Sequence, residues 1–266
     1  MRIEYEDTQI LVVYKEAGLP VQSGKTSGKD LVSLLKNYLA QNRPEGSTPA
    51  PYLGIVHRLD QPVEGLLVFA KTPKAAAALS RQAQAKGESS PGDKGGAGSE
   101  RGKRSEQDGS KTGGMEKRPG QGKTAAGGME KIYIAKVELS GAAYPLALEG
   151  RKREILLTDW ILRDYAGNRS LIVAEGERDA KRASLSFRTL EIQGSRALLE
   201  IRLYTGRHHQ IRAQMAHAGM PLAGDYKYGA EGPDEKQLCL CAARLGFDHP
   251  STGRRMQFQV DPGFTL

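Results

Sequence analysis

The chain has 266 residues, of which 38% are apolar, and this is enough to bury a sizeable core in one large domain or two small ones. Lysine and arginine outnumber aspartate and glutamate by 39 to 31, and the resulting formal net charge of +8 favours an anionic partner. An export signal, a bilayer-spanning apolar stretch and a disulfide framework are all lacking, so we expect a cytoplasmic protein with no membrane partner.

The first predicted elements are short strands and helices. Apolar runs at residues 10–14 and 66–70 are typical of buried strands. Between residues 31 and 39 leucines recur at helical spacing, which predicts a helix there. Thr72 and Pro73 are a suitable N-cap and first residue for a second helix.

From about residue 86 to residue 130 the composition changes. This segment is rich in Gly, Ser, Lys and Glu and contains no aromatic residue, Leu, Ile or Val. Because it buries too little apolar surface to offset the entropy of ordering, we predict a disordered insert within a single domain spanning residues 1–266. A GQGKT sequence inside it resembles the end of a phosphate-binding loop, but Lys117 replaces the first glycine of that motif, so we expect no nucleotide site.

The second half of the chain is predicted to be mostly strands. Apolar and polar residues alternate at residues 132–139, 155–162, 185–192 and 198–203. A helix is predicted over residues 207–218, ended by Gly219. Runs of strands with scattered helices indicate an α+β fold, in which a mixed, largely antiparallel sheet is flanked by helices and loops.

The first cluster of reactive side chains is His57, Arg58 and Asp60, on a turn-rich loop before the second apolar strand. Loops held by a rigid sheet commonly carry reactive groups, although a surface ion pair explains this cluster equally well. Tyr133 lies on a predicted strand, where a lone tyrosine is usually packed in the core. Such a ring near a nucleophile could instead stack on an extruded base.

A second cluster lies between a predicted strand and a predicted helix and contains Gly206, Arg207, His208, Gln210 and Arg212. We expect Gly206 to permit a tight turn. Backbone N–H groups at the start of the helix, together with Arg207, suit a phosphate. On a helix Arg207 and Arg212 lie about 140° apart, so we expect them to serve different partners.

Two pairs of side chains are possible metal ligands. His208 and His209 are adjacent on the predicted helix and are expected to point apart, while Cys239 and Cys241 alternate on a strand. Zinc would need further ligands at suitable spacing, so we expect buried core cysteines and no metal site. No other cofactor is expected.

Together and in this order, these passages resemble the RluA-type family of pseudouridine synthases. The matching passages are VHRLD at 56–60, GLLVFAK at 65–71, KIYIA at 131–135, TGRHHQIR at 205–212 and GD at 224–225. The family usually has Thr-Ser or a similar pair where this chain has Val63 and Glu64, and we expect Glu64 to face solvent. Some relatives carry an N-terminal S4 domain, which we do not expect here because the catalytic pattern starts at about Ile3.

The resemblance implies an enzyme that isomerises specific uridines in structured ribosomal or transfer RNA to pseudouridine, without metal or cofactor. Asp60 would be the nucleophile, Tyr133 would stack on the target base and assist proton removal, and Arg212 would pair with Asp60. Arg58 would help to displace the base, and the other expected RNA contacts are His57, Gly206, Arg207, His208 and Gln210. We expect a monomer.

Two alternatives stay open. A non-catalytic RNA-binding or ribosome-assembly protein could use the same scaffold. A metal-dependent nuclease would need clustered carboxylates and a divalent ion.

Overall fold

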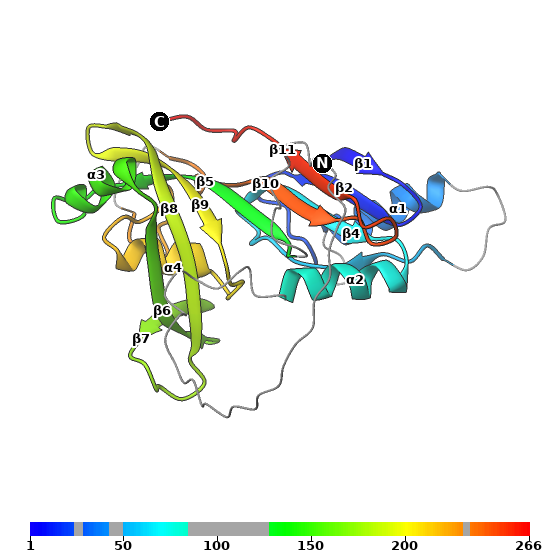
Figure 1. Ribbon diagram of the computed structural model, residues 1–266, viewed down its shortest axis with the longest axis horizontal. Coiled ribbons are helices and arrows are strands. Elements are labelled where there is room, and N and C mark those ends of the chain that lie inside the picture. Colours follow the sequence, from blue (N-terminus) through cyan, green and yellow to red (C-terminus); the bar gives the residue numbers. More distant parts are fainter. Residues whose placement is uncertain (24–28, 43–49, 85–127, 231–234) are drawn as a thin grey trace, which may run out of the picture.

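The computed structural model describes residues 1–23, 29–42, 50–84, 128–230 and 235–266. In this part of the chain eleven strands form one sheet, in the order β1-β2-β4-β10-β5-β9-β8-β6-β7, with β3 beside β4 and β11 beside β10 (Figure 1). Neighbouring strands are antiparallel, except that β4 and β10 are parallel. The predicted α+β fold with a mixed, largely antiparallel sheet is confirmed.

The elements follow the predicted order. The strands are β1 Arg2–Glu6, β2 Ile10–Lys15, β3 Gly54–Ile55, β4 Glu64–Ala70, β5 Glu130–Glu138, β6 Ile155–Asp164, β7 Arg169–Val173, β8 Lys181–Gln193, β9 Arg196–Leu203, β10 Leu240–Asp248 and β11 Arg255–Gln259. The helices are α1 Leu31–Gln41, α2 Pro73–Gln84, α3 Tyr144–Lys152 and α4 Gln210–His217. Five elements were not predicted. The helix α3 has no clear apolar periodicity, and the strands β1, β3, β7 and β11 have at most five residues each.

Both faces of the sheet are covered, and this explains the continuous apolar runs. Along β4, Leu67 and Phe69 pack in one core cluster with α1, while Leu66 and Val68 pack in the other with α2. A strand that is buried on both sides has no polar face, so its sequence does not alternate. Tyr133 of β5 belongs to the first cluster, so it lies on the same face of the sheet as α1.

The predicted insert and its GQGKT sequence lie outside the described residues, apart from the last three positions. Met129 is buried in the core, and Glu130 begins β5. Arg255 Nη1 donates a hydrogen bond to the Gly128 carbonyl at 2.9 Å. Residues 128–130 are therefore part of the folded domain.

No helix in the described ranges has both the length and the apolar character needed to span a membrane.

The parallel pairing of β4 with β10 depends on Gly65. Its φ is +119°, a conformation that other residues rarely adopt, and a Cβ atom added there would lie 2.5 Å from the backbone nitrogen of Ala242. Since neighbouring backbone cannot move without breaking the pairing, only glycine fits at this position. β4 follows the loop that carries Asp60, so this close approach also sets the position of that loop.

We therefore expect Gly65→Ala to lower the free energy of unfolding by ~2 kcal/mol or more, through backbone strain and the clash with β10. Urea titration of the two proteins measures this difference. Gly141→Ala is the matched control, because an added Cβ at Gly141 meets no atom within 4 Å. Equal effects of the two substitutions would contradict the packing argument.

Candidate active site

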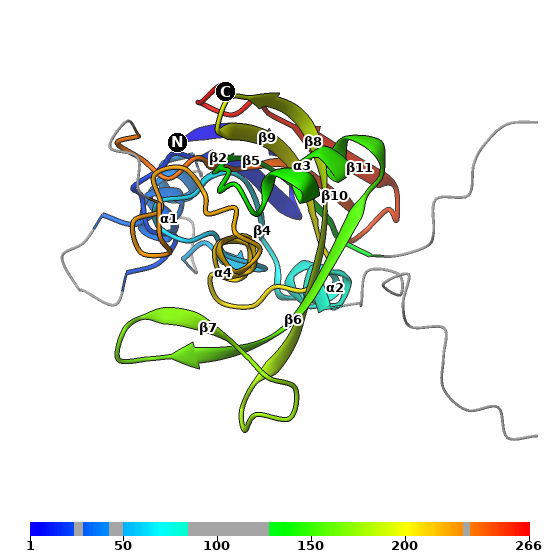
Figure 2. The ribbon, with the colours of Figure 1, turned by 90° about the vertical axis from the view of Figure 1, so that its left-hand side faces the viewer.

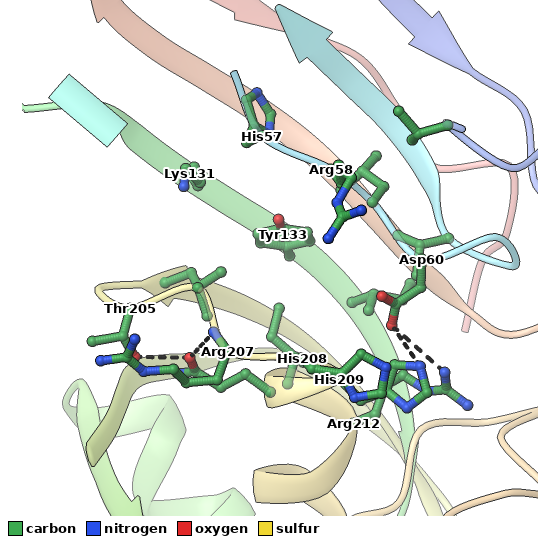
Figure 3. Close-up of a pocket in the computed structure, with 18 of the residues that line it drawn as sticks. His57, Arg58, Asp60, Lys131, Tyr133, Thr205, Arg207, His208, His209 and Arg212 are labelled. Carbon is green, nitrogen blue, oxygen red and sulfur yellow. Dashed lines mark hydrogen bonds and ion pairs between the residues drawn. The ribbon is translucent and has the colours of Figure 1, made fainter. Parts of the chain in front are cut away.

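A cavity of about 910 Å³ lies where the loop before β4, the strand β5 and the turn before α4 meet (Figure 3). Its size suits a small ligand or a single extruded nucleotide. The three segments are distant in the sequence, yet every predicted site residue lines this one cavity: His57, Arg58, Asp60, Tyr133, Gly206, Arg207, His208, Gln210 and Arg212.

The charge of the cavity wall is strongly asymmetric. Among its described lining residues Asp60 is the sole carboxylate, while the cationic side chains are Arg58, Lys131, Arg163, Arg207 and Arg212. Cationic walls around a concave surface concentrate anionic ligands there. The cavity therefore suits a polyanion whose reacting group can approach one negatively charged side chain.

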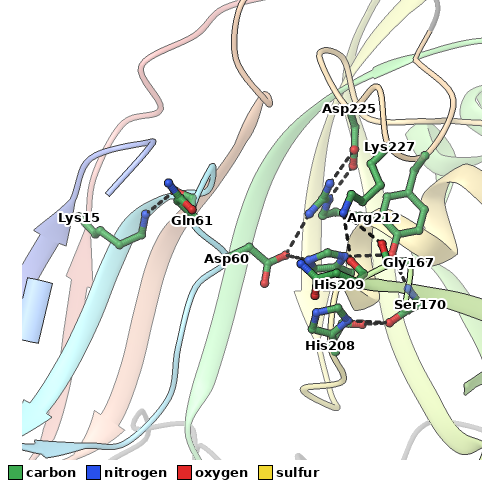
Figure 4. A network of polar contacts seen from close by, with 12 residues as sticks. Lys15, Asp60, Gln61, Gly167, Ser170, His208, His209, Arg212, Asp225 and Lys227 are labelled. Carbon is green, nitrogen blue, oxygen red and sulfur yellow. Dashed lines mark hydrogen bonds and ion pairs between the residues drawn. The ribbon is translucent and has the colours of Figure 1, made fainter. Parts of the chain in front are cut away.

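Arg212 joins this carboxylate to a second one. The side chain of Arg212 is buried on the first turn of α4, and its Nε and Nη2 atoms donate hydrogen bonds to Asp225 at 2.7 and 2.8 Å (Figure 4). Its Nη1 atom lies 3.5 Å from Asp60 Oδ2, within ion-pair distance. Burial lowers the pKa of Arg212, but the hydrogen bonds and charge of Asp225, helped by the charge of Asp60, outweigh this and raise it. The guanidinium thus stays charged.

His209 approaches the same carboxylate from the start of α4. Its φ of 48° is left-handed, which prevents the helix from extending further toward the N-terminus, so α4 begins at Gln210 rather than at the predicted residue 207. This backbone also places the His209 ring 3.8 Å from that of His208, nearly parallel to it. The prediction that the two histidines point apart is therefore wrong.

His209 is neutral at neutral pH. Burial, followed by the positive charge of Arg212, lowers its pKa to about 3. Its Nε2 atom lies 3.6 Å from Asp60 Oδ2, and its Nδ1 atom is 3.0 Å from the hydroxyl of Tyr228. An uncharged ring at this distance does not neutralise Asp60, so the charged partner of Asp60 is Arg212.

Three residues that support this arrangement were not predicted as site residues: Asp225, Tyr228 and Ser170. The Tyr228 ring lies 5.0 Å from the Arg212 guanidinium, and its hydroxyl accepts a hydrogen bond from the Ser170 backbone at 2.6 Å. The Ser170 hydroxyl is 3.1 Å from His208 Nδ1. Strand β7 is thereby tied to the residues around Asp60. Only Asp225 had a signal in the sequence, within the matching GD pair.

Gln210 holds the turn before α4. It is 3% exposed, and its Oε1 atom accepts hydrogen bonds from the Thr205 hydroxyl at 2.7 Å and from the Arg207 backbone at 3.0 Å. The Arg207 N–H, which was expected to suit a phosphate, is thus already used. Gly206 has neither a positive φ nor a neighbour within 4 Å of an added Cβ, so the turn does not require glycine.

Tyr133 and His57 lie on the sheet side of the cavity. Burial, followed by the charge of Asp60, raises the pKa of Tyr133, so its phenol stays protonated. Burial and the charge of Lys131 lower the pKa of His57 to about 3, and its Nε2 atom is 3.5 Å from the backbone nitrogen of Val68. Arg58 is exposed and lines the same cavity as Tyr133 (Figure 3).

A buried lysine anchors the loop that carries Asp60. The Lys15 side chain is fully buried, and its ammonium group donates hydrogen bonds to the carbonyls of Glu16, Leu19 and Gln61 at 3.0, 2.8 and 3.0 Å. Burial lowers its pKa to about 8. Because Gln61 directly follows Asp60, Lys15 fixes the backbone of the carboxylate loop from the side opposite Arg212 (Figure 4).

Glu64 does not face solvent as expected. It is half-buried, and its carboxylate accepts hydrogen bonds from the Tyr14 hydroxyl at 2.9 Å and the Gly263 backbone at 2.6 Å. None of these three residues lines the cavity. The Glu64 carboxylate therefore lies outside the cavity that Asp60 lines.

The two pairs of side chains that were weighed as possible metal ligands do not form a cluster in the described residues. Both cysteines are buried free thiols, as predicted. Across the described ranges, no three His, Cys, Asp or Glu side chains are grouped so that they could hold a metal ion.

A model of the RNA pseudouridylate synthase family matches residues 9–89 and 122–217 of the chain. The chain belongs to this family. It is 43% identical over 99 residues, 37% of its own length and 32% of the relative's, to an uncharacterized RNA pseudouridine synthase of Bacillus subtilis, YlyB.

Two further relatives match nearly the whole chain. It is 29% identical over 272 residues to ribosomal large subunit pseudouridine synthase D of Zymomonas mobilis, covering 98% of the chain and 69% of that relative. It is 27% identical over 267 residues to ribosomal large subunit pseudouridine synthase C of Escherichia coli O6:H1. This match covers 97% of the chain and 65% of that relative. The chain thus spans about two thirds of the length of these two relatives.

Two solved human structures share the fold of this family member. Human RNA Pseudouridylate Synthase Domain Containing 4 superposes with a TM-score of 0.63 at 17% identity, over 98% of this chain and 88% of that one. Human RNA Pseudouridylate Synthase Domain Containing 1 superposes with a TM-score of 0.61 at 16% identity, over 98% of this chain and 82% of that one. At these identities the likeness establishes the fold alone.

The lowered pKa of His209 makes the stability of this family member sensitive to acid. Between its ordinary pKa of 6.5 and its folded value of about 3, the unfolded chain binds a proton that the folded chain does not. The contribution of His209 to the free energy of unfolding is therefore fully present above pH 6.5. It decreases by roughly 1 kcal/mol per pH unit as the pH falls from 6.5 toward 3. His57, with its pKa also lowered to about 3, adds to the same decline.

We expect His209→Asn to make the decline shallower by roughly 1 kcal/mol per pH unit, because one titrating group is removed. Asparagine tolerates the left-handed backbone at this position, so the substitution does not add strain. The measurement is the free energy of unfolding of both proteins from urea titrations at several pH values between 4 and 7. Parallel curves for the two proteins would show that His209 is not buried in its neutral form.

Proposed function

We propose that this chain isomerises uridine in structured RNA to pseudouridine, with Asp60 as the nucleophile. One observation carries the proposal: the sole carboxylate among the described lining residues of a cationic cavity lies 3.5 Å from a buried arginine that a second carboxylate holds in place. A nucleophile must point at the reacting atom, and the fixed guanidinium beside Asp60 sets the direction of its carboxylate. The surrounding positive charge suits the phosphates of RNA.

The reaction needs no atoms beyond those of the substrate. The bond from C1′ of the ribose to N1 of the uracil breaks, a bond from C1′ to C5 forms, and the proton on C5 is replaced by one on N1. Asp60 would attack the base or C1′ and hold one fragment covalently while the uracil turns. This isomerisation involves no net redox change or hydrolysis, so residues of the chain can carry it.

The target base must leave its stack to reach Asp60, and this costs a few kcal/mol. Tyr133 offers an aromatic face in the cavity, and stacking on such a face is worth ~1–3 kcal/mol per base. Arg58, exposed at the rim, is suited to occupy the space that the base leaves. The raised pKa of Tyr133 keeps its phenol protonated, which supports the stacking role over the expected role in proton removal.

The relatives' names point to the RNA of the large ribosomal subunit as the substrate to test first. Transfer RNA is the second substrate implied by the sequence resemblance. His57 and Gln210, whose side chains are engaged inside the protein, are proposed to position the two cavity loops, while Arg207, Gly206 and His208 are proposed to contact RNA. The monomeric state and the cytoplasmic location stay predictions.

We expect Asp60→Asn to lower the rate of pseudouridine formation by about three orders of magnitude or more, because the amide is not a nucleophile. The assay incubates each protein with RNA from cells lacking it, in the presence of chelator, and maps pseudouridine. Glu64→Gln is the matched control, because Glu64 lies outside the cavity and should leave the map unchanged.

Identical maps from the wild type and Asp60→Asn would favour the non-catalytic RNA-binding alternative. Cleavage of RNA that chelator abolishes would favour the metal-dependent nuclease.

Asp225 is proposed to be a positioning residue that acts through Arg212. Asp225→Asn removes one charge-assisted hydrogen bond and frees the guanidinium to turn, so we expect kcat to fall about 100-fold with a smaller change in KM. Asp225→Glu, which keeps the charge, should recover part of the loss. Steady-state kinetics on the mapped RNA, with the melting temperature as a control for folding, tests this, and an unchanged kcat in a folded Asp225→Asn protein would contradict it.

A further inference from the structure

We propose that Tyr165 and Arg163, at the tip of the β6–β7 hairpin, form a second nucleotide subsite that stacks on a base next to the target uridine. The inference rests on the proposed RNA-modifying function. It names a part of the substrate, a single-stranded neighbour of the target, that the cavity around Asp60 does not itself hold.

The first observation is an aromatic ring presented to solvent beneath a cation. Tyr165 is 78% exposed, the largest fraction of any large hydrophobic side chain in the described residues. The Arg163 guanidinium lies 4.7 Å from the centre of its ring. An arginine on one face of a tyrosine leaves the other face free for a base, and both groups attract the π-face of a nucleobase.

The second observation is that the turn carrying Tyr165 is held in place. Asp164 accepts hydrogen bonds from the Gly167 backbone at 3.0 Å and from Arg169 Nε at 3.2 Å. Lys227, from the loop after α4, donates to the Asn168 carbonyl at 3.1 Å. A ring on a fixed turn loses little entropy on binding, so stacking there contributes more to affinity than it would on a loose loop.

The third observation is that the hairpin adjoins the cavity. Arg163 itself lines the cavity that contains Asp60, so the Tyr165 ring lies one side chain beyond its edge. Strand β7 is tied through Ser170 to His208 and Tyr228, and α4 packs against both strands of the hairpin. Figure 2 shows the hairpin beside α4. A strand of RNA leaving the cavity therefore meets Tyr165 next.

The chemistry around the tip suits RNA rather than a protein. Arg163 lies against the Tyr165 ring, and the same turn is bound by two further cations, Arg169 at Asp164 and Lys227 at the Asn168 carbonyl. Besides Tyr165, the exposed apolar side chain on this turn is the small Ala166. A protein interface needs a contiguous apolar centre, which a single ring does not provide. One ring among cations matches the alternation of bases and phosphates in a single strand.

The test is equilibrium binding of uridine monophosphate and of a uridine pentanucleotide, in the Asp60→Asn background so that the ligand stays unchanged. We expect Tyr165→Ala to weaken pentanucleotide binding about tenfold and to leave the mononucleotide unaffected. Tyr165→Phe, which keeps the stacking face, should bind like the parent protein. Tyr144→Ala, at an exposed tyrosine on α3 outside the cavity, is the matched control.

A second measurement identifies the base that stacks. Pentanucleotides lacking the base on one or the other side of the central uridine are compared, and one of them should lose as much affinity as Tyr165→Ala does. For that ligand Tyr165→Ala should cause no further loss, because the two changes remove the same contact. The slope of the logarithm of the binding constant against the logarithm of the salt concentration should be the same in Tyr165→Ala as in the parent protein, because the ring carries no charge. In Arg163→Ala the magnitude of this slope should fall by about one if the guanidinium also contacts a phosphate.

Unchanged pentanucleotide binding in Tyr165→Ala, or an equal loss for mononucleotide and pentanucleotide, would overturn the inference. The proposed function would survive that result, since Asp60-dependent pseudouridine formation is measured separately. Conversely, a chain that binds the pentanucleotide through Tyr165 but forms no pseudouridine would keep the subsite and lose the proposed function.

Discussion

A buried guanidinium shared by two carboxylates is the interaction on which the site depends. Arg212 is 7% exposed, and a buried positive charge is costly unless it is fully paired. Asp225 takes two of its nitrogens in a fork geometry that lysine could not reproduce, and the remaining nitrogen lies toward Asp60. Because Asp225 is 2% exposed and cannot turn away, it sets the direction in which Arg212 presents its charge.

The carboxylate loop is held from two sides, which explains how one reactive group can be both accessible and fixed. Lys15 binds the Gln61 carbonyl from within the β2 side of the fold, and Arg212 approaches from α4. Asp60 itself keeps 29% of its side chain exposed to the cavity. Rigid support with an open face is what a nucleophile needs, since the cost of orienting it is met during folding. Tyr133 and the cationic rim then have only to place the substrate.

Local patterns in the sequence predicted the strands well, because β2, β4, β5 and β9 carry apolar runs or alternation that depend on nothing distant. The members of the cavity were named from a family resemblance, and their spacing alone does not imply that they meet. What escaped prediction depends on the tertiary structure. The left-handed backbone of His209 shortens α4 and stacks two histidines. Asp225 and Glu64 find their partners across the fold, and no local pattern encodes these contacts.

The most direct test of the account is a crystal structure of the Asp60→Asn protein bound to a uridine-containing fragment of its RNA. The account predicts a uracil extruded into the cavity, with its ring against Tyr133, its ribose beside the side chain at position 60, and Arg212 still held by Asp225. RNA bound on another face, or Arg212 released from Asp225 and turned to a phosphate, would contradict it.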